Sequence, residues 1–138
     1  MHNSIFFHTS DQDLIPTQST YCHISQADNY KDGTLEEIIF QDLLDYFVDD
    51  NIESILKIAH NKLQNDGILH IQGSDIRQLS IALTFNSITD ELAKKILYPY
   101  KKSIHTISEI LDLLKKIGFK IENKRYVNVF EYYIRAYK

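Results

Sequence analysis

The side chains of this sequence that can do chemistry include six histidines and one cysteine. The histidines inside the chain lack the His-x-x-x-His spacing that places two imidazoles on one helix face to bind a metal ion. We therefore expect no metal site, and we interpret His70, within an apolar run, as an ordinary strand residue. Cys22 has no neighbour that would activate its thiolate. The sequence also has no Gly-x-Ser-x-Gly motif, no P-loop and no Rossmann dinucleotide fingerprint.

A second group of polar residues follows a short apolar run. Residues 37–41 have the length and composition of a strand, and Gln41, Asp42 and Tyr46 stand at its end or just beyond. In open parallel sheets, ligands bind beyond the carboxyl ends of the strands. These three side chains are therefore candidates for ligand contacts. The alternative, which we favour for each, is structural: Asp42 and Asp45 would be solvated acids, and Tyr46 would belong to the core.

The elements that would position these residues are a strand, a helix and a second strand. We expect the helix to begin at Asp50, because Glu53 follows at the spacing of a capping box and an apolar stripe at 3.6-residue spacing comes after it. Asp66-Gly67 should end the helix, with Gly67 in a left-handed cap, and residues 68–72 should form the second strand. A strand, a helix and a strand at this spacing predict a parallel sheet.

The C-terminal third of the sequence predicts an antiparallel arrangement instead of a parallel one. Thr106 and Glu109 have capping-box spacing before a second apolar helical stripe, and Gly118 should end that helix. Residues 119–122 and 126–137 are then expected to be two successive strands, paired antiparallel at one edge of the sheet.

Two stretches are harder to assign. Residues 76–105 contain alternating apolar residues that fit a strand, but a helix fits equally well. Residues 4–8 and 20–24 are candidate strands near the N-terminus. The connection between them has only about a dozen residues, which leaves little room for a full crossover helix.

Length and charge narrow the class of protein. The chain has 138 residues and a formal net charge of −4, so we expect one domain over residues 1–138 and no nucleic-acid partner. No stretch approaches the roughly 18 apolar residues of a membrane span. The N-terminal residues also lack the features of a signal peptide. We therefore expect a cytoplasmic protein without membrane association.

Three motifs together resemble class I S-adenosylmethionine (SAM)-dependent methyltransferases, in particular the small, methyltransferase type 11-like members. Residues 32–47, DGTLEEIIFQDLLDYF, resemble the fourth-strand region, where "DEI" precedes an apolar strand and "LEH" or "LEY" follows it. Residues 63–71, LQNDGILHI, resemble "L-x-P-G-G-x-L-x-I", and Ser74-Asp75 resembles the "P-D" that follows. Residues 110–119, ILDLLKKIGF, resemble "L-x-x-L-L-x-x-x-G-F". The resemblance covers about residues 32–138.

This resemblance implies an α/β fold, a three-layer Rossmann-like methyltransferase sandwich. Its sheet would be mostly parallel with an antiparallel C-terminal strand, and here it would be reduced at the N-terminus. The resemblance also implies SAM as a possible cofactor. Contacts with SAM would then fall on Gln41, Asp42 and Tyr46, and Asp28 could replace the acid that the family places beside the adenine.

The N-terminal part departs from the family's cofactor motifs. Members have a Gly-x-Gly loop after the first strand, whereas this chain has no glycine before Gly33. His8 and Ser10 stand where those glycines belong, and a Cβ there would intrude on the cofactor's space. Asp11 could contact the amino-acid end or the ribose of a shifted SAM. The second strand ends at His23 or Ser25, where the family has an acid.

Two hypotheses follow for the function. One is a SAM-dependent methyltransferase with a degraded cofactor site, acting on a small molecule or a glycan precursor. His105 would be its general base, since this loop often borders the substrate in the family. The other is a non-catalytic interaction or regulatory subunit that retains the fold. We favour methyltransferase ancestry without independent catalysis.

Aromatic residues gather near the C-terminus, at Tyr126, Phe130, Tyr132, Tyr133 and Tyr137. Alternate members should pack on the helices, and the others should be exposed at the sheet edge. Such an edge would suit a homodimer contact, and a catalytic partner protein is the other partner we consider.

Overall fold

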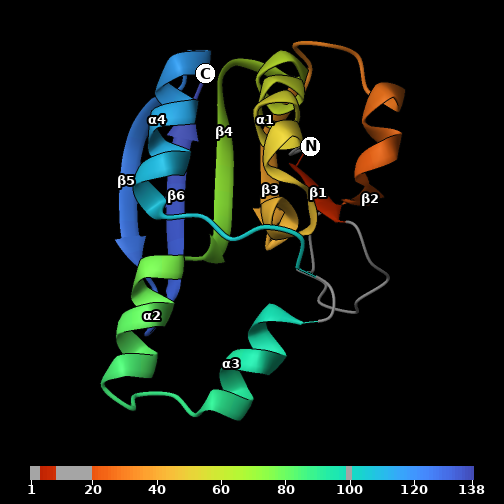
Figure 1. Cartoon of the computed structure of the whole chain (residues 1–138). Coiled ribbons are helices and arrows are strands. Elements are labelled where there is room, and N and C mark those ends of the chain that lie inside the picture. The colour runs from red at the N-terminus through yellow and green to blue at the C-terminus, as the bar shows by residue number, and fades with distance from the viewer. Residues whose placement is uncertain (1–3, 9–19, 99–100) are drawn as a thin grey trace.

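The computed structural model describes residues 4–8, 20–98 and 101–138. One six-stranded sheet runs through them in the order β2-β1-β3-β4-β6-β5 (Figure 1). Its strands are β1 (Ser4–His8), β2 (Thr20–His23), β3 (Leu35–Gln41), β4 (Leu63–Ser74), β5 (Lys120–Tyr126) and β6 (Glu131–Tyr137). The pairs β1–β2, β1–β3 and β3–β4 are parallel, whereas β6 is antiparallel to both β4 and β5. This confirms the predicted α/β class, with a mostly parallel sheet and an antiparallel C-terminal strand.

Helix α1 (Asp49–Lys62) connects β3 to β4, as the predicted βαβ unit requires. Its buried residues are Ile52, Ile55, Leu56 and Ala59. They pack with the helix face of β3 and β4 in a single core, which also contains the buried face of α4 (Ile107–Ile117). Helices α1 and α4 therefore lie side by side over one face of the sheet (Figure 1).

The predicted limits of α1 were wrong at both ends. The helix begins at Asp49 after Val48, with no side-chain cap, so Asp50 and Glu53 make no capping box. It ends at Lys62, and β4 begins at the next residue because Leu63 already pairs with Leu35. Gly67 thus lies inside β4. A Cβ there would be 2.9 Å from a backbone oxygen, so close approach, and not a left-handed cap, requires glycine.

The C-terminal elements follow the prediction more closely. Thr106 and Glu109 form both hydrogen bonds of a capping box before α4, and Gly118 ends the helix at φ 117°. The division of the following hairpin was wrong, however. Tyr126 is the last residue of β5, and β6 begins only at Glu131. Between them Asn128 Oδ1 accepts hydrogen bonds from the N–H groups of Phe130 and Glu131, which fixes the turn.

The apolar alternation after Ile76 lies in a helix, which was one of the two alternatives predicted. Helices α2 (Ile76–Thr84) and α3 (Asp90–Leu97) form an arm that projects beyond the carboxyl ends of β3 and β4 (Figure 1). Two 3-10 helices complete the description: η1 (Ile24–Asn29) follows β2, and η2 (Leu43–Tyr46) follows β3. Within the described ranges, no helix is long and apolar enough to cross a membrane.

The two faces of the sheet differ in character. Ile38 and Phe40 of β3 are buried under the helices. The alternate side chains of β3, β4 and β6 are half-buried and mostly polar. On this second face His70 Nε2 lies 2.5 Å from Glu37 Oε1, and His70 Nδ1 lies 2.6 Å from the Tyr133 hydroxyl. His70 is therefore a strand residue, as predicted, and it also joins a polar chain across β3, β4 and β6.

Candidate functional site

The candidate site lies where β3 and β4 end at the same edge of the sheet. Asp42 directly follows β3, and its N–H donates to the Gln72 carbonyl of β4 over 2.8 Å. Its backbone is left-handed, with φ 54°, a conformation that a short polar side chain tolerates better than most. Polar residues at such strand ends are the usual ligand contacts in parallel sheets.

The carboxyl group of Asp42 is placed in a poorly solvated position. Burial raises its pKa to about 6, although the nearby Lys101 lowers it. Among the described residues, Asp42 Oδ1 is buried and has no hydrogen-bond partner. A carboxyl group with this pKa exchanges its proton near neutral pH, which is a property of many functional acids.

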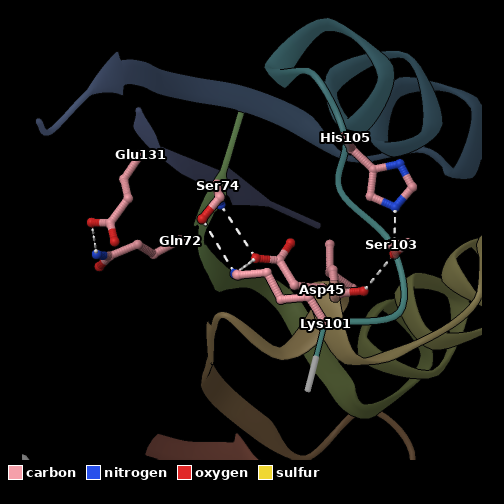
Figure 2. Close-up of polar contacts among 8 residues, drawn as sticks. Asp45, Gln72, Ser74, Lys101, Ser103, His105 and Glu131 are labelled. Carbon is pink, nitrogen blue, oxygen red and sulfur yellow. Dashed lines mark hydrogen bonds and ion pairs between the residues drawn. The ribbon is translucent and has the colours of Figure 1, made fainter. Parts of the chain in front are cut away.

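Asp45 is the most buried acid of the site, and it is not the solvated residue that we expected. Its side chain is 1% exposed, and Oδ2 contacts the ammonium group of Lys101, which is itself 12% exposed (Figure 2). The N–H of Ser74 also donates to Oδ2 over 3.4 Å, and Lys101 Nζ donates to Ser74 Oγ over 3.2 Å. Burial raises the pKa of Asp45, and the Lys101 ammonium opposes this effect.

Lys101 belongs to a segment that we call the strap, residues 101–106, which returns from the arm to α4. Two strap N–H groups, those of Lys102 and Ser103, donate to the carbonyl of Asp45 over 2.7 and 3.1 Å. Ser103 Oγ lies 3.3 Å from the Leu44 carbonyl and 3.0 Å from His105 Nε2 (Figure 2). The first half of the strap, residues 101–103, is therefore bound to η2 by backbone and side-chain contacts.

His105 lies at the end of the strap and is 9% exposed. Besides Ser103, its ring nitrogens face Asp49 Oδ1 at 3.6 Å and Glu109 Oε2 at 3.7 Å. Its backbone forms an isolated parallel bridge with Asp75. In this arrangement the imidazole positions the strap, and its role as a general base stays a prediction.

Asp75 connects three elements at the same edge. It caps α2 by accepting from the N–H of Gln78 over 3.0 Å, and it accepts from the N–H of Ile107, the first residue of α4, over 2.8 Å. The hydroxyl of Tyr126 donates to the same carboxylate over 3.4 Å. Asp75 thus connects the N-termini of α2 and α4, and its backbone bridge with His105 fixes the C-terminal end of the strap.

The structure places the other predicted contacts as follows. Gln41, the last residue of β3, and Tyr46, the last residue of η2, are half-buried and belong to the same strand-end region as Asp42. Asp28 is exposed on η1, which packs beside β2. His8 ends β1, but its side chain lies outside the described residues, as do Ser10 and Asp11.

Sequence reasoning missed Lys101, named Ser74 and Asp75 only as part of a motif and not as site residues, and misjudged Asp45. A local signal existed for Asp45. It lies within the apolar run 43–47, and an acid among residues that pack in the core is expected to be partly buried. The pairing with Lys101 has no local signal, since the two residues are 56 positions apart. Within the described part of the chain, no three His, Cys, Asp or Glu side chains are grouped so as to hold a metal ion.

Comparisons with known proteins bear on the fold. No family model matches the sequence, and no curated protein matches it. Many solved structures are nevertheless similar. A SAM-dependent methyltransferase from Methanosarcina mazei superposes with a TM-score of 0.67 at 14% identity, over 99% of this chain and 82% of that one. One from Archaeoglobus fulgidus has a TM-score of 0.64 at 12% identity, over 97% and 75% of the two chains.

A third neighbour shows a ligand in the same fold. It is the 1,6-didemethyltoxoflavin-N1-methyltransferase of Burkholderia thailandensis, solved with 1,6-didemethyltoxoflavin and S-adenosylhomocysteine bound. Its TM-score is 0.64 at 12% identity, over 98% of this chain and 70% of that one. The strand order and the antiparallel β6 are consistent with these superpositions on methyltransferase structures. The chain has the fold of the class I SAM-dependent methyltransferases.

Proposed function

We propose that this protein is a methyltransferase-fold protein with a reduced SAM site, and that it acts as a non-catalytic binding or regulatory subunit. The observation that carries the proposal is the Lys101 ammonium at the ends of β3 and β4. It contacts Asp45 and Ser74 at the sheet edge where α/β proteins receive their ligands. The chain's own strap thus uses polar groups that would otherwise be available to a ligand.

The residues that would surround SAM, the methyl donor, support the same proposal, because they do not fit SAM as the family binds it. No glycine precedes Gly33, so every residue of the β1–β2 connection carries a Cβ. Ile24 and Ser25 follow β2, where an acid would accept hydrogen bonds from the ribose hydroxyls. Asp28, the possible substitute, is exposed on η1. We therefore derive no methyl-transfer step for this chain.

Isothermal titration with SAM and with S-adenosylhomocysteine tests the reduced site. The Burkholderia methyltransferase, which was solved with S-adenosylhomocysteine bound, serves as the positive control. We expect heat of binding for the control and none for this protein, and no thermal shift with either ligand. Micromolar binding of S-adenosylhomocysteine to this protein would overturn the proposal.

An active methyltransferase is the second candidate, and Asp42 favours it. A buried carboxyl with a pKa of about 6 at a strand end could accept a proton from an acceptor at neutral pH. The acceptor would then be a small molecule or a glycan precursor, with His105 as a further candidate base. Transfer of a labelled methyl group from SAM to such an acceptor, lost in the Asp42→Asn variant, would establish this candidate over the first.

A further inference from the structure

A groove of about 240 Å³ lies between helix α4 and the edge strand β5. Its lining comes from these two elements alone: Leu111 and Lys115 of α4, and residues 121–124 of β5. None of these residues belongs to the candidate site at the ends of β3 and β4. Pockets for drug-sized ligands have volumes of roughly 300–1,000 Å³, so this groove suits a smaller molecule.

The most buried residues of the lining are apolar. Leu111 is 6% exposed and belongs to the hydrophobic core, and Ile121 packs against the same core from β5. An apolar part of a ligand placed on these two side chains would be removed from water. The groove therefore offers apolar contact at its base.

A β-bulge directs Lys124 toward this groove. Two successive residues of β6 pair with Ile121 and Asn123 of β5, so Glu122 is an extra residue on β5. Beyond the bulge, Lys124 pairs with Ile134, which is fully buried in the core under the helices. Residues directly opposite in antiparallel strands lie on the same face, so Lys124 lies on the face that α4 covers. Bulges commonly re-aim a side chain in this way next to binding sites.

Two lysines make the groove electropositive. Lys115 and Lys124 both line it and are exposed, and within the described ranges neither has an ion-pair partner. The acid of the lining, Glu122, is paired, since its Oε2 lies 2.8 Å from Arg135 Nε. Arg135 is opposite His70 of β4, so it lies on the second face of the sheet. The Glu122 carboxylate is thereby turned away from the two ammonium groups.

The sheet edge beside the groove is less suited to a second copy of the chain, which the sequence suggested as its partner. Most exposed side chains of β5 are charged, and its register with β6 shifts after Ile121. Charges and irregular register at an edge strand oppose strand addition. The aromatic residues there are also largely engaged. Tyr132 is fully buried, as predicted for alternate members, and of the cluster only Tyr126, at 46%, is among the exposed side chains.

We propose that the groove between α4 and β5 binds a small carboxylate that carries an apolar chain. The carboxylate would accept hydrogen bonds from the ammonium groups of Lys115 and Lys124, and the chain would cover Leu111 and Ile121. This site is separate from the ends of β3 and β4, so the proposal does not depend on whether SAM binds there.

Three probes with the same alkyl chain separate the effect of charge from that of apolar contact: octanoate, 1-octanol and octylammonium. Their binding to the full chain is followed through the amide signals in NMR spectra. Octanoate should shift the signals of residues 111, 115 and 121–124 saturably. Octanol should bind at least tenfold more weakly, and octylammonium should give no shifts there. The absence of octanoate shifts at these residues up to roughly 10 mM, or equal binding of octylammonium, would overturn the proposal.

A pair of double variants tests the two lysines. Lys115→Gln with Lys124→Gln should weaken octanoate binding at least tenfold. The matched control is Lys116→Gln with Lys120→Gln, which changes one exposed lysine on each of the same elements and the same net charge. Lys116 contacts Glu53 over 2.9 Å, and Lys120 lies over the ring of Tyr137, so neither lines the groove. The control should bind octanoate as the natural protein does, and circular dichroism checks that both variants are folded. An equal loss in the control would show that net charge alone attracts octanoate and would overturn the proposal.

Discussion

The ammonium group of Lys101 contacts the carboxylate of Asp45 inside the protein, where both side chains are almost completely removed from solvent. The pair joins the strap to η2, the 3-10 helix that follows β3, across 56 positions of sequence. Ser74, at the end of β4, contacts both partners. The candidate site is therefore held in shape by one buried ion pair and its hydrogen bonds.

Removing one partner of this pair should destabilise the protein strongly. Lys101→Met leaves Asp45 buried and unpaired, and we expect it to lower the free energy of unfolding by about 3–5 kcal/mol. Asp45→Asn in the same chain removes the unpaired charge and should recover much of the loss. The measurement is urea unfolding of the three proteins. The matched control is Lys57→Met, an exposed lysine whose ammonium lies 2.8 Å from Glu53 and whose removal should leave the free energy of unfolding almost unchanged. Equal losses in Lys101→Met and Lys57→Met would contradict the assignment.

Asp42 should make the stability of the protein depend on pH between about 4 and 6. Its pKa is raised from 3.8 to about 6 in the folded state, so in this range the folded chain binds the proton more tightly than the unfolded chain. Ionisation of Asp42 therefore costs stability as the pH rises, up to about 3 kcal/mol above pH 6. Asp42→Asn removes that cost and tolerates the left-handed backbone.

Chemical denaturation at pH 4 and pH 8 checks this prediction. The Asp42→Asn variant should be more stable than the natural protein at pH 8, and the two should be nearly equal at pH 4. Asp28→Asn, an exposed aspartate, provides a control with no change at either pH. A difference between natural and Asp42→Asn proteins that is the same at both pH values would show that the carboxyl group is not the cause.

Gly73 should not tolerate a side chain beside the buried ring of Tyr132. A Cβ at Gly73 would lie 2.8 Å from the Tyr132 hydroxyl oxygen and 3.0 and 3.3 Å from two carbons of the ring, which is fully buried. We expect Gly73→Ala to cost about 1–3 kcal/mol. Tyr132→Phe removes the nearest atom, and that hydroxyl has no hydrogen-bond partner among the described residues. Because the two ring carbons remain, thermal unfolding of the double variant should recover only part of the loss, and no recovery at all would show that the hydroxyl is not a cause of the strain.

The elements that the sequence predicted well are those with local causes. Thr106 and Glu109 form their capping box because both hydrogen bonds lie within one turn. Asp50 and Glu53 have the same spacing, but Val48 is the N-cap and α1 starts one residue earlier, with Asp49 and Asp50 together in its first turn. There the acids favour the helix through its dipole. Spacing alone does not distinguish the two cases.

The site was predictable only in part for a related reason. Gln41 and Asp42 could be inferred from the end of β3, because strand ends in parallel sheets form the ligand edge. The burial of Asp45 and its contact with Lys101 depend on the path of the strap, which returns from the arm after α3. That path is a tertiary property with no periodic pattern in the sequence.

The bridge between Asp75 and His105 has a consequence for how this chain can change. The polypeptide leaves the body after Asp75, contacts η2 again through Lys101 to Ser103, and then pairs with Asp75 at His105. The two ends of the excursion therefore lie next to each other. The arm between them can lengthen, shorten or be exchanged without disturbing β4 or the start of α4, provided that Lys101 still reaches Asp45.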